Sequence, residues 1–563
     1  MSTSRCIGIL GCLFSLWAGP AFGYEALRGP TELRYWNPDK AYNGYTLFAT
    51  YYRIYLIDMA GEVVHTWPTA NNPRFLDYNG HIMDATNDAP NQLRGFEELD
   101  WDGAVVWRHL ETRPEYTFHH DFVRIFNQQL GDYTTLYIAN KSVAHASAIA
   151  AGCDPAHGPY DGAQVDAIVE VDMNGQVVWE WWFFDHGVQD IDPGKPNYVG
   201  EGKTIADHPG RINLNLPGKP LSRDWLHCNS LDYNPALGHL VINAFNGEFY
   251  VIDHDGTFIP GDVTASLALA AGPAGDFLYR FGDPARYQQG LAPRLLEDWT
   301  KSTTGHKQIG ASHDVHWIPP GRPGAGHFLI FNNGQHLFEI TPQSYVVEVD
   351  PYRVSIDAAT DHYVNPPDAG YYTLTTPFQG TLKAPKQISN QTVWKYATKS
   401  NQAFFSHIGS GAQRLPNGNT LICSMTEGHL FEVTPDGELV WEYICPVSTR
   451  GIVKELEDDY PLTNGVFRAY RYAADHPALA GRDLSPKGPI TEFYNTPTPT
   501  PTATATPPLP GDVHRDGRID HLDVFDFSTE WQGTEAGSLK ADLDGDGQVD
   551  ADDLLLLIDA VLK

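Results

Sequence analysis

Residues 432–443, EVTPDGELVWEY, show the unit from which most of this chain is built. Apolar residues alternate with acidic ones on either side of an Asp-Gly turn, and a tryptophan follows. Alternation with a period of two around such a turn is typical of a β-hairpin and not of a helix. Similar units are LIDMAGEVVHTW (56–67), ELDWDGAVVW (98–107) and EVDMNGQVVWEW (170–181). Two further copies are more divergent, and each is split into two segments: 250–258 followed by 277–284, and 346–351 followed by 392–396.

The six copies of this unit decide the fold class. Each copy follows another strand-like run, such as GHLVINAF (238–245) or NGNTLICSM (417–425). Three or four short strands per repeat, repeated six times, predict an all-β, six-bladed β-propeller, whereas a β-sandwich would lack the six-fold recurrence. Either end of the chain could complete a shared blade, so the way the ring closes stays open.

The composition supports a large folded core and an acidic surface. The chain has 563 residues, of which 42% are hydrophobic and 12% aromatic. Its 70 acidic residues outnumber the 38 basic ones and give a net charge of −32, which repels phosphate backbones. We therefore expect no nucleic-acid partner.

The composition changes sharply at Asn495. Residues 496–510 read TPTPTPTATATPPLP, a Pro/Thr tract that cannot form a core and favours an extended spacer. The predicted organisation has four parts: a signal peptide (1–23), the propeller (24–490), a linker (491–510) and a small α-helical calcium-loop module (511–563).

The first residues read as a secretory signal. Arg5 supplies a positive charge, an apolar run extends from Ile7 to Trp17, and Ala21-Phe22-Gly23 fits a cleavage site. We predict that the chain is secreted, periplasmic or held at the cell surface, and no later run is apolar enough to span a membrane. Export permits disulfides, but three pairings are possible among the remaining cysteines, Cys153, Cys228, Cys423 and Cys445.

Histidines recur at the same phase of the repeat, where the inner strand of a blade begins. They are His119 and His120 in FHHDF, His227 in DWLHCNS, His313 and His316 in SHDVHW, and His407 in FSHIGSGAQ. Because the innermost strands of a propeller line its central channel, these side chains are expected to converge on the axis. The residues that could orient the imidazoles are Asp121, Asn229, Asp314 and Asn332.

A ring of imidazoles allows several kinds of chemistry. It could bind a transition metal, supply a nucleophile with acid–base partners, or hold an anion. Each histidine could also be a structural residue hydrogen-bonded to the backbone. Four histidines at a matched phase favour a functional site, but the residues alone do not choose among these chemistries.

The segments around these histidines resemble the bacterial arylsulfotransferases (aryl-sulfate sulfotransferases). The resemblance rests on DWLHCNSLDYNP, on SHDVHWIPPGRPGAGHFLIFNNG and on FSHIGSGAQRLPNGNTLI followed by FEVTPDGELVWEY, and it covers nearly all of 42–475. It implies a six-bladed propeller that moves a sulfuryl group from an aryl sulfate donor to a phenolic acceptor. The implied route passes through a sulfohistidine and needs neither a nucleotide sulfate donor nor a catalytic cofactor.

The resemblance also implies roles for individual residues. His407 matches the histidine that becomes sulfated, and His227 and His313 match two further channel histidines. The sulfate-binding arginine would be Arg414 or Arg280, Asn229 belongs to the His-x-Asn segment, and His120 with His119 is the alternative nucleophile. The competing hypothesis is a non-catalytic propeller that binds a ligand or a protein partner in its channel.

Two segments near the C-terminus follow the pattern of a calcium loop, in which carboxylates alternate along a tight turn. The second, DLDGDGQVDADD (542–553), is nearly ideal, while the first, DVHRDGRIDHLD (512–523), has a histidine at its third position. Because calcium prefers oxygen ligands, the first loop should bind more weakly. The predicted ligands are Asp512, His514, Asp516, Arg518, Asp520 and Asp523, and Asp542, Asp544, Asp546, Gln548, Asp550 and Asp553.

Each loop runs directly into an apolar helical segment, VFDFSTEW or LLLLIDAVLK. Paired loop–helix units of this kind resemble a type I dockerin. The resemblance implies folding that depends on calcium and docking onto a cohesin-like protein.

Overall fold

The computed structural model describes residues 29–493 except 52, 69–70, 89–90, 157–161, 217–220, 293–304, 335–342, 375–385, 399–403, 450 and 456–463. The predicted signal peptide, residues 494–510 of the predicted linker and the calcium loops lie outside the described residues, whereas residues 491–493 belong to a short helix. The chain divides into two units, Met1–Tyr494 and Asn495–Lys563. The exact domain bounds given above stay predictions.

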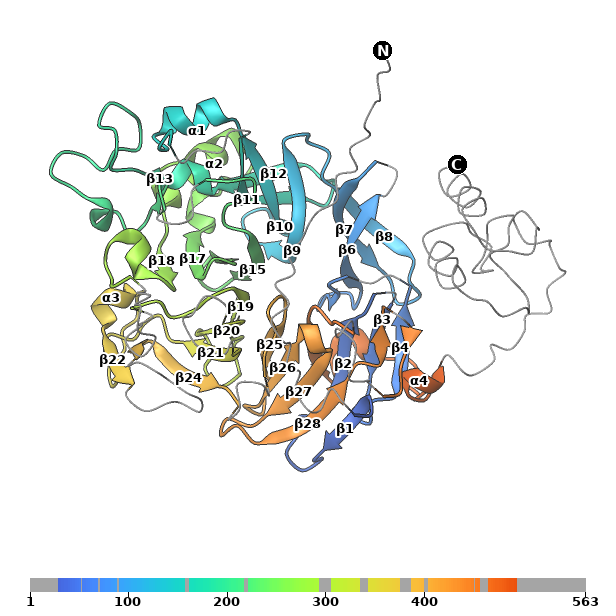
Figure 1. Ribbon diagram of the computed structural model, residues 1–563. Helices are drawn as coiled ribbons and strands as arrows, with labels where there is room; N and C mark the ends of the chain where they lie inside the picture. The colour runs from blue at the N-terminus through green and yellow to red at the C-terminus, as the bar shows by residue number, and fades with distance from the viewer. Residues whose placement is uncertain are drawn as a thin grey trace, which may run out of the picture. The chain divides into compact units, whose positions relative to one another are not determined.

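Six antiparallel sheets of four or five strands form a ring, so the fold is a six-bladed β-propeller as predicted (Figure 1). From the innermost strand outward, the first three blades are β31 (Ala469–Ala473), β2 (Gly44–Ala49), β3 (Ile54–Ile57) and β4 (Val63–Trp67); β5 (Arg74–Phe75), β6 (Ile82–Asp88), β7 (Leu93–Leu99) and β8 (Val105–Leu110); and β9 (Tyr116–Asn127), β10 (Asp132–Val143), β11 (Ala163–Asp172) and β12 (Val177–Trp182).

The second half of the ring has the same plan. Its blades are β15 (Cys228–Asn234), β16 (His239–Ala244), β17 (Glu248–Asp253) and β18 (Tyr279–Phe281); β19 (Ser312–Trp317), β20 (Phe328–Asn332), β21 (Tyr345–Val349) and β24 (Thr392–Tyr396); and β25 (Gly411–Arg414), β26 (Thr420–Ser424), β27 (His429–Val433), β28 (Leu439–Ile444) and β1 (Glu32–Trp36).

Short elements fill the connections between these strands. They are α1 (His145–Ala151), β13 (Gly187–Val188), β14 (Ile212–Asn213), α2 (Val263–Ala270), α3 (Pro366–Ala369), β22 (Tyr371–Leu374), β23 (Lys386–Ser389), β29 (Val447–Ser448), β30 (Gly451–Ile452) and α4 (Ile490–Phe493). Within the described part of the chain, no helix is long and apolar enough to cross a membrane.

Both ends of the propeller take part in closing the ring. The late strand β31 pairs with β2 and becomes the inner strand of the first blade, while the early strand β1 pairs with β28 at the outside of the last blade. Residues 487–493 then pass over the same seam. Val63 exchanges backbone hydrogen bonds with Lys487 and Gly488, and Thr491 donates to the carboxylate of Glu32 from both its N–H and its hydroxyl, each at 2.9 Å.

The recurring tryptophan ties each blade to the next. The Trp67 indole N–H donates to the carbonyl oxygen of Asp100, and the Trp441 indole to that of Met59, each acceptor lying in the hairpin turn of the following blade. The indoles of Trp107, Trp179 and Trp394 make the corresponding bonds to Met173 O, Thr257 Oγ1 and Pro435 O. In the fourth blade the Tyr279 hydroxyl takes this place and donates to Gln391 at 2.9 Å.

The four cysteines outside the predicted signal peptide are all buried, and each is a free thiol. Cys228 and Cys423 lie on strands of different blades.

Candidate functional site

The inner strands that carry the histidines are irregular at the point where each histidine stands. The pairing of β9 with β10, of β15 with β16 and of β19 with β20 shifts its register there. Beside these shifts the backbone has a positive φ at His120 (57°), His227 (54°) and Asp314 (54°). A β-bulge bends its strand and redirects the side chains next to it, so these irregularities turn polar side chains toward the channel.

The imidazole rings of three blades come together around one aromatic side chain. Nδ1 of His119 lies 2.8 Å from Nδ1 of His120, and the His120 ring centroid is 4.7 Å from that of His227. The ring of Phe245, in the turn after β16, lies 5.4 Å from His227 and 5.6 Å from His313. We call His119, His120, His227 and His313 the channel histidines.

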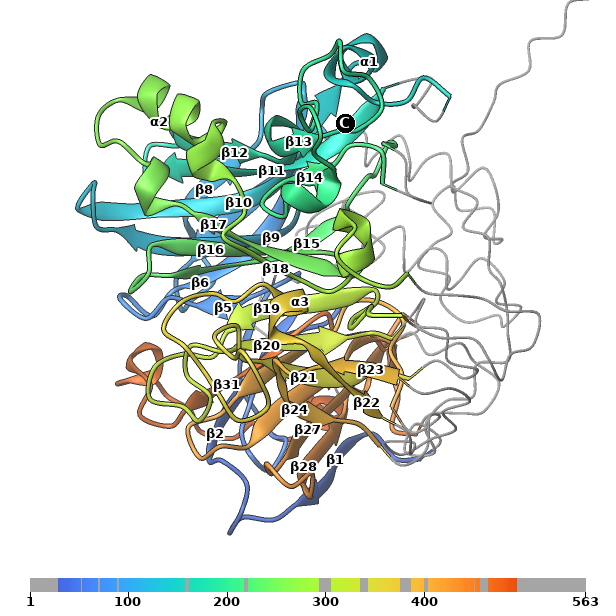
Figure 2. The same ribbon diagram turned by 90° about the vertical axis from the view of Figure 1, so that its left-hand side faces the viewer.

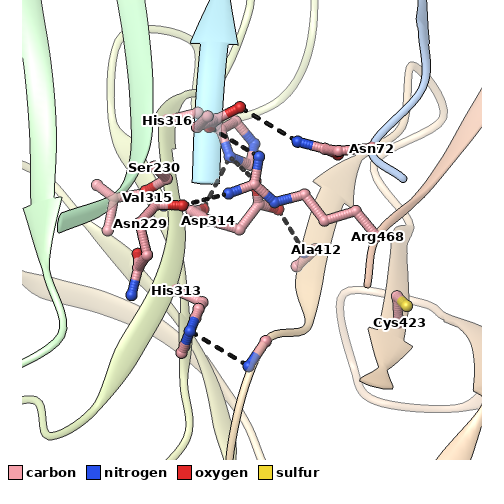
Figure 3. Close-up of polar contacts among 12 residues, drawn as sticks. Asn72, Asn229, Ser230, His313, Asp314, Val315, His316, Ala412, Cys423 and Arg468 are labelled. Atoms are coloured by element: carbon pink, nitrogen blue, oxygen red, sulfur yellow. Dashed lines mark hydrogen bonds and ion pairs between the residues drawn. The ribbon is translucent and has the colours of Figure 1, made fainter. Parts of the chain in front are cut away.

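Arg468 lies among these strands at the start of β31 and joins several of them (Figure 3). Its Nη1 donates to Asp121 Oδ2 at 2.8 Å, its Nη2 donates to the carbonyl oxygen of Asn229 at 2.9 Å, and its Nε lies 3.3 Å from Asp314 Oδ1. Arg74, on β5, donates to the other oxygen of Asp121 at 2.6 Å. Burial would raise the pKa of the Asp121 carboxyl, but the two guanidinium groups outweigh it and lower that pKa.

Sequence reasoning missed Arg468 and Arg74. Arg468 stands directly before AYRYA, which becomes β31. Assigning this late run to the innermost position of the first blade would have placed Arg468 in the channel. Arg74 lies on the two-residue strand β5, which is too short to have a recognisable period.

The hydrogen bonds of His313 fix its tautomer. Nδ2 of Asn333 donates to the carbonyl oxygens of Ser406 and Gly409, so Oδ1 of Asn333 is the atom that lies 2.7 Å from His313 Nδ1. Nδ1 of His313 therefore carries the proton, and Nε2 accepts the N–H of Gly409 at 3.2 Å (Figure 3). The orienting residue is Asn333 and not its neighbour Asn332, whose Oδ1 accepts the N–H of Gly310.

The channel keeps the imidazoles of His120 and His313 neutral. Burial, followed by the positive charge of Arg468 and the nearby His227, lowers the pKa of His313 to about 3, although its bond to Asn333 acts in the opposite direction. Burial and then the neighbouring imidazoles hold the pKa of His120 well below its usual value. A neutral imidazole has a lone pair that can attack an electrophile or accept a proton.

Two carboxylates lie beside the remaining channel histidines, and one of them orients its histidine by a hydrogen bond. Asp224 Oδ2 lies 2.6 Å from Nδ1 of His227, so that nitrogen is the donor. The His227 side chain is 33% exposed, which leaves it accessible to a substrate. On the other side, Asp166 Oδ1 lies 3.2 Å from Nε2 of His119 and accepts the N–H of Cys228.

Several buried polar atoms of this region have no hydrogen-bond partner. They are Asn72 Oδ1, Arg74 Nε, His119 Nε2, Asp166 Oδ2 and Arg468 Nε. Such atoms are uncommon in native interiors, and a group of them in one place is typical of a site that hydrogen-bonds a ligand or water. Within the described ranges, no group of three or more His, Cys, Asp or Glu side chains is arranged to hold a metal ion.

The structure places His407 differently from the channel histidines. It is exposed in the loop that leads to β25, and partial burial of its ring lowers its pKa. Ser406 and Gly409, on either side of it, both bond to Asn333. The loop is therefore fastened to the channel, with His407 between its two fixed points.

Both arginines chosen from the sequence have structural partners on middle or outer strands, Arg414 in the neighbouring blade and Arg280 in its own. Arg414 donates to Glu348 at 2.7 Å and lies over the ring of Trp394. Arg280, on the outermost strand β18, forms a buried ion pair with Glu248. Asn229 is fully buried, and its amide donates to the carbonyl oxygen of Ser312, so its side chain connects two neighbouring inner strands.

Comparison with known families agrees with the resemblance stated above. Residues 43–247 match the arylsulfotransferase (ASST) family. Residues 510–562 match the type I dockerin domain. The arylsulfotransferase match includes His120, His227 and Asn229 and ends before His313 and Arg468, so the second half of the ring is assigned by its geometry.

Solved structures add little at the level of sequence. Similar chains include a protein of unknown function from Bacteroides caccae (12% identity, TM-score 0.34, covering 76% of this chain and 98% of that chain) and a β-propeller domain from Myceliophteria thermophila (10%, 0.30, 73% and 89%). A third is the periplasmic gluconolactonase PpgL of Pseudomonas aeruginosa (12%, 0.30, 74% and 98%). No curated protein matches the chain.

Proposed function

We propose that the channel transfers a sulfuryl group from an aryl sulfate to a phenolic acceptor through an N-sulfohistidine, without a nucleotide sulfate donor. The observation that carries this proposal is the convergence of imidazoles from three blades beside buried Arg468, in a chain whose first propeller half matches the arylsulfotransferases. Neutral imidazoles supply nucleophiles, and guanidinium donors stabilise negative charge on the sulfuryl oxygens.

His227 is the nucleophile that the geometry favours most. Asp224 accepts the proton of its Nδ1, so attack on sulfur would occur through Nε2. Because Nδ1 keeps its proton, the sulfated ring is an imidazolium, and the Asp224 carboxylate compensates its positive charge. An orienting carboxylate behind an attacking imidazole is the usual arrangement of such a pair.

The two half-reactions balance as follows. In the first, the N–S bond forms as the S–O bond to the aryl group breaks, and a phenolate leaves. In the second, the acceptor oxygen attacks sulfur, the N–S bond breaks, and the acceptor's proton passes to a neutral imidazole. His120 is the nearest candidate for this proton, because its ring lies 4.7 Å from that of His227.

Arg468 and Arg74 are the proposed partners of the sulfuryl oxygens. Neither Nε makes a hydrogen bond, although that of Arg468 lies 3.3 Å from Asp314 Oδ1, and the terminal nitrogens of both arginines hold Asp121 in place. His313 is less suited to this role, because one nitrogen bonds Asn333 and the other accepts the Gly409 N–H. We assign His313 the positioning of the loop that contains His407.

His407, the nucleophile implied by the family resemblance, remains the second candidate. Asn333 and His313 bond to the backbone of Ser406 and Gly409, on either side of His407, and so hold its loop against the channel. The two candidates lie on different peptides, so one experiment separates them.

That experiment is to trap the intermediate. The full chain is incubated briefly with 4-nitrophenyl sulfate, quenched at alkaline pH, digested and examined by mass spectrometry. One sulfuryl group is expected on the peptide that contains His227, and His227→Asn is expected to abolish both this adduct and nitrophenol release. His362→Asn, a change at an exposed histidine, is the matched control.

The other outcomes are equally informative. An adduct on the His407 peptide that survives in His227→Asn would transfer the nucleophilic role to His407. If no peptide gains a sulfuryl group and nitrophenol is not released, the channel is a binding site for a ligand or partner protein, which is the competing hypothesis.

We further propose that the protein is exported and docked. The support is the apolar N-terminal run and the match of residues 510–562 to type I dockerins, whose paired loops suit calcium and a cohesin-like partner. The proposed calcium ligands are the twelve residues named above, six in each of the loops at 512–523 and 542–553.

A further inference from the structure

A second group of buried polar atoms without hydrogen-bond partners lies near the channel, next to Phe245. Within the described residues, the atoms without a hydrogen-bond partner include both side-chain polar atoms of Asn246, Nη1 of Arg286, and the hydroxyls of Tyr287 and Tyr371. Together with Lys307 these residues are called the side cluster. The nearby elements β18, α3 and β22 lie on the side of the propeller turned to the viewer in Figure 2.

The members of the side cluster are neighbours. Arg286 Nη2 donates to the carbonyl oxygen of Asn246 at 2.9 Å, and a Cβ on the adjacent Gly247 would lie 3.2 Å from Cε of Lys307. Tyr287 follows Arg286 in the short helix Pro284–Tyr287 and is 1% exposed. The ring of Tyr371 stacks on that of His306, the neighbour of Lys307, with 4.1 Å between their centroids.

The charges of this region leave a positive excess. The cationic side chains are Arg280, Arg286 and Lys307, and the acidic ones are Glu248 and Asp283. Arg280 pairs with Glu248 at 2.9 Å, whereas Arg286 lies 3.6 Å from Glu248 and 3.6 Å from Asp283. Three cations against two carboxylates give one net positive charge when Lys307 is protonated. Lys307 is only 7% exposed, and burial followed by the charge of Arg286 lowers the pKa of its amine to about 8.

The unsatisfied groups are mainly donors. Asn246 Nδ2, Arg286 Nη1 and the two phenolic hydroxyls can donate, whereas Asn246 Oδ1 is the one unsatisfied group that can only accept. The amine of Lys307 adds further donors beside them. A buried site with surplus donors and one surplus positive charge fits a ligand that is rich in acceptors and negatively charged.

We propose that the side cluster is a second anion site, which binds an oxyanion through Lys307, Arg286, Asn246, Tyr287 and Tyr371. It is separate from the channel histidines, because Phe245, which precedes Asn246, packs against His227 and His313 on the channel side. The oxyanion has two possible sources, a free inorganic anion or an acidic substituent on an aromatic substrate. The site does not depend on which reaction the channel performs.

The position of the anion is tested directly with selenate, a sulfate analogue whose selenium gives an anomalous X-ray signal. Crystals of the full chain soaked in selenate are expected to show an anomalous peak within hydrogen-bond distance of Lys307 and Tyr287. A peak beside Arg468 alone, or water in the side cluster at saturating selenate, would overturn the proposal.

Affinity is measured in solution by calorimetry with inorganic sulfate. Tyr287→Phe removes one donor that has no partner in the empty site, so its melting temperature should not fall, while its sulfate affinity at this site should drop about tenfold or more. Lys307→Met is expected to lose binding at the site altogether. Lys203→Met, at an exposed lysine, is the matched control and should bind like the unaltered chain.

The two sources are separated by comparing inorganic sulfate with benzoate. Binding of sulfate alone identifies a site for a free anion. Binding of benzoate that Lys307→Met abolishes identifies a site for an acidic aromatic ligand. If Tyr287→Phe, Lys307→Met and the unaltered chain all bind both probes equally well, the side cluster is not an anion site.

Discussion

Arg468 is the residue at which the polar contacts of the channel meet, and its geometry makes a sharp prediction. It contacts Asp121, Asn229 and Asp314 with three different nitrogens, which a lysine cannot reproduce even though it keeps the charge. Arg468→Lys is therefore expected to lower kcat/KM for aryl sulfate by about 10²–10³-fold, the usual effect of losing a well-placed donor to developing negative charge. The control is Arg108→Lys. Arg108 lies on the outer strand β8 and forms an ion pair with Glu97, and this variant should retain activity. Steady-state kinetics and melting temperatures for both variants test the prediction, which fails if Arg468→Lys is as active as the control.

The sequence predicted the phase of the histidines but not their orientation. The alternation of apolar and polar residues located the inner strands correctly because it follows from burial of one strand face. The side chains that meet in the channel depend on bulges beside His120, His227 and Asp314, and a one-residue irregularity leaves no mark in the apolar pattern. The partners Asp224 and Asn333 were missed for the same reason: the choice between Asn332 and Asn333 depends on which of two adjacent side chains faces the loop.

At the scale of elements, one buried histidine links β11 to the turn after β17. His254 lies between Glu170 at 2.9 Å and Asp255 at 2.7 Å. Burial opposes its charge, but the hydrogen bonds to Asp255 and Glu170 outweigh burial and raise its pKa to about 9. Because the pKa in the unfolded chain is about 6.5, this group stabilises the fold fully below pH 6.5 and loses its contribution, about 3 kcal/mol, as the pH rises toward 9.

The free energy of unfolding, measured in urea from pH 6 to pH 9.5, checks this dependence. The unaltered chain is expected to lose more stability across this interval than His254→Gln, which has no titrating ring at the position. His362→Gln, at an exposed histidine, serves as the control and should follow the unaltered chain. Parallel curves for all three proteins would contradict the assignment.

The tryptophan that recurs in five of the six repeats, with Tyr279 in its place in the fourth blade, also has its explanation at this scale. Each indole N–H reaches the hairpin turn of the next blade, as Trp441 reaches Met59 across the seam of the ring. The repeat could thus be counted from the sequence because the same contact is required in every blade. Closure could not be predicted, since β31 and β1 differ from the other repeats in length and pattern and are defined by their partners alone.

At the scale of the whole molecule, the propeller and the C-terminal segment are expected to work independently. Removal of residues 495–563 should leave kcat and KM for aryl sulfate unchanged, since all channel residues precede the division of the chain at Tyr494.

The isolated segment 495–563 should gain helical circular dichroism on adding calcium, with the loop at 542–553 filling before the loop that contains His514. Calorimetry should resolve two unequal calcium affinities. A segment that is fully helical in chelator, or a folded but inactive truncated propeller, would contradict the prediction.

The path of residues 487–493 has a mechanical consequence. These residues bond to Val63 in the first blade and, through Thr491, to Glu32 on the strand that completes the last blade. If the C-terminal segment is held by a fixed partner while the propeller is dragged by flow or by its substrate, the pull enters the protein at this seam. The force is then shared between two blades. The hydrogen bonds between Thr491 and Glu32 carry part of it, so no single β-hairpin has to bear the whole force and unfold first.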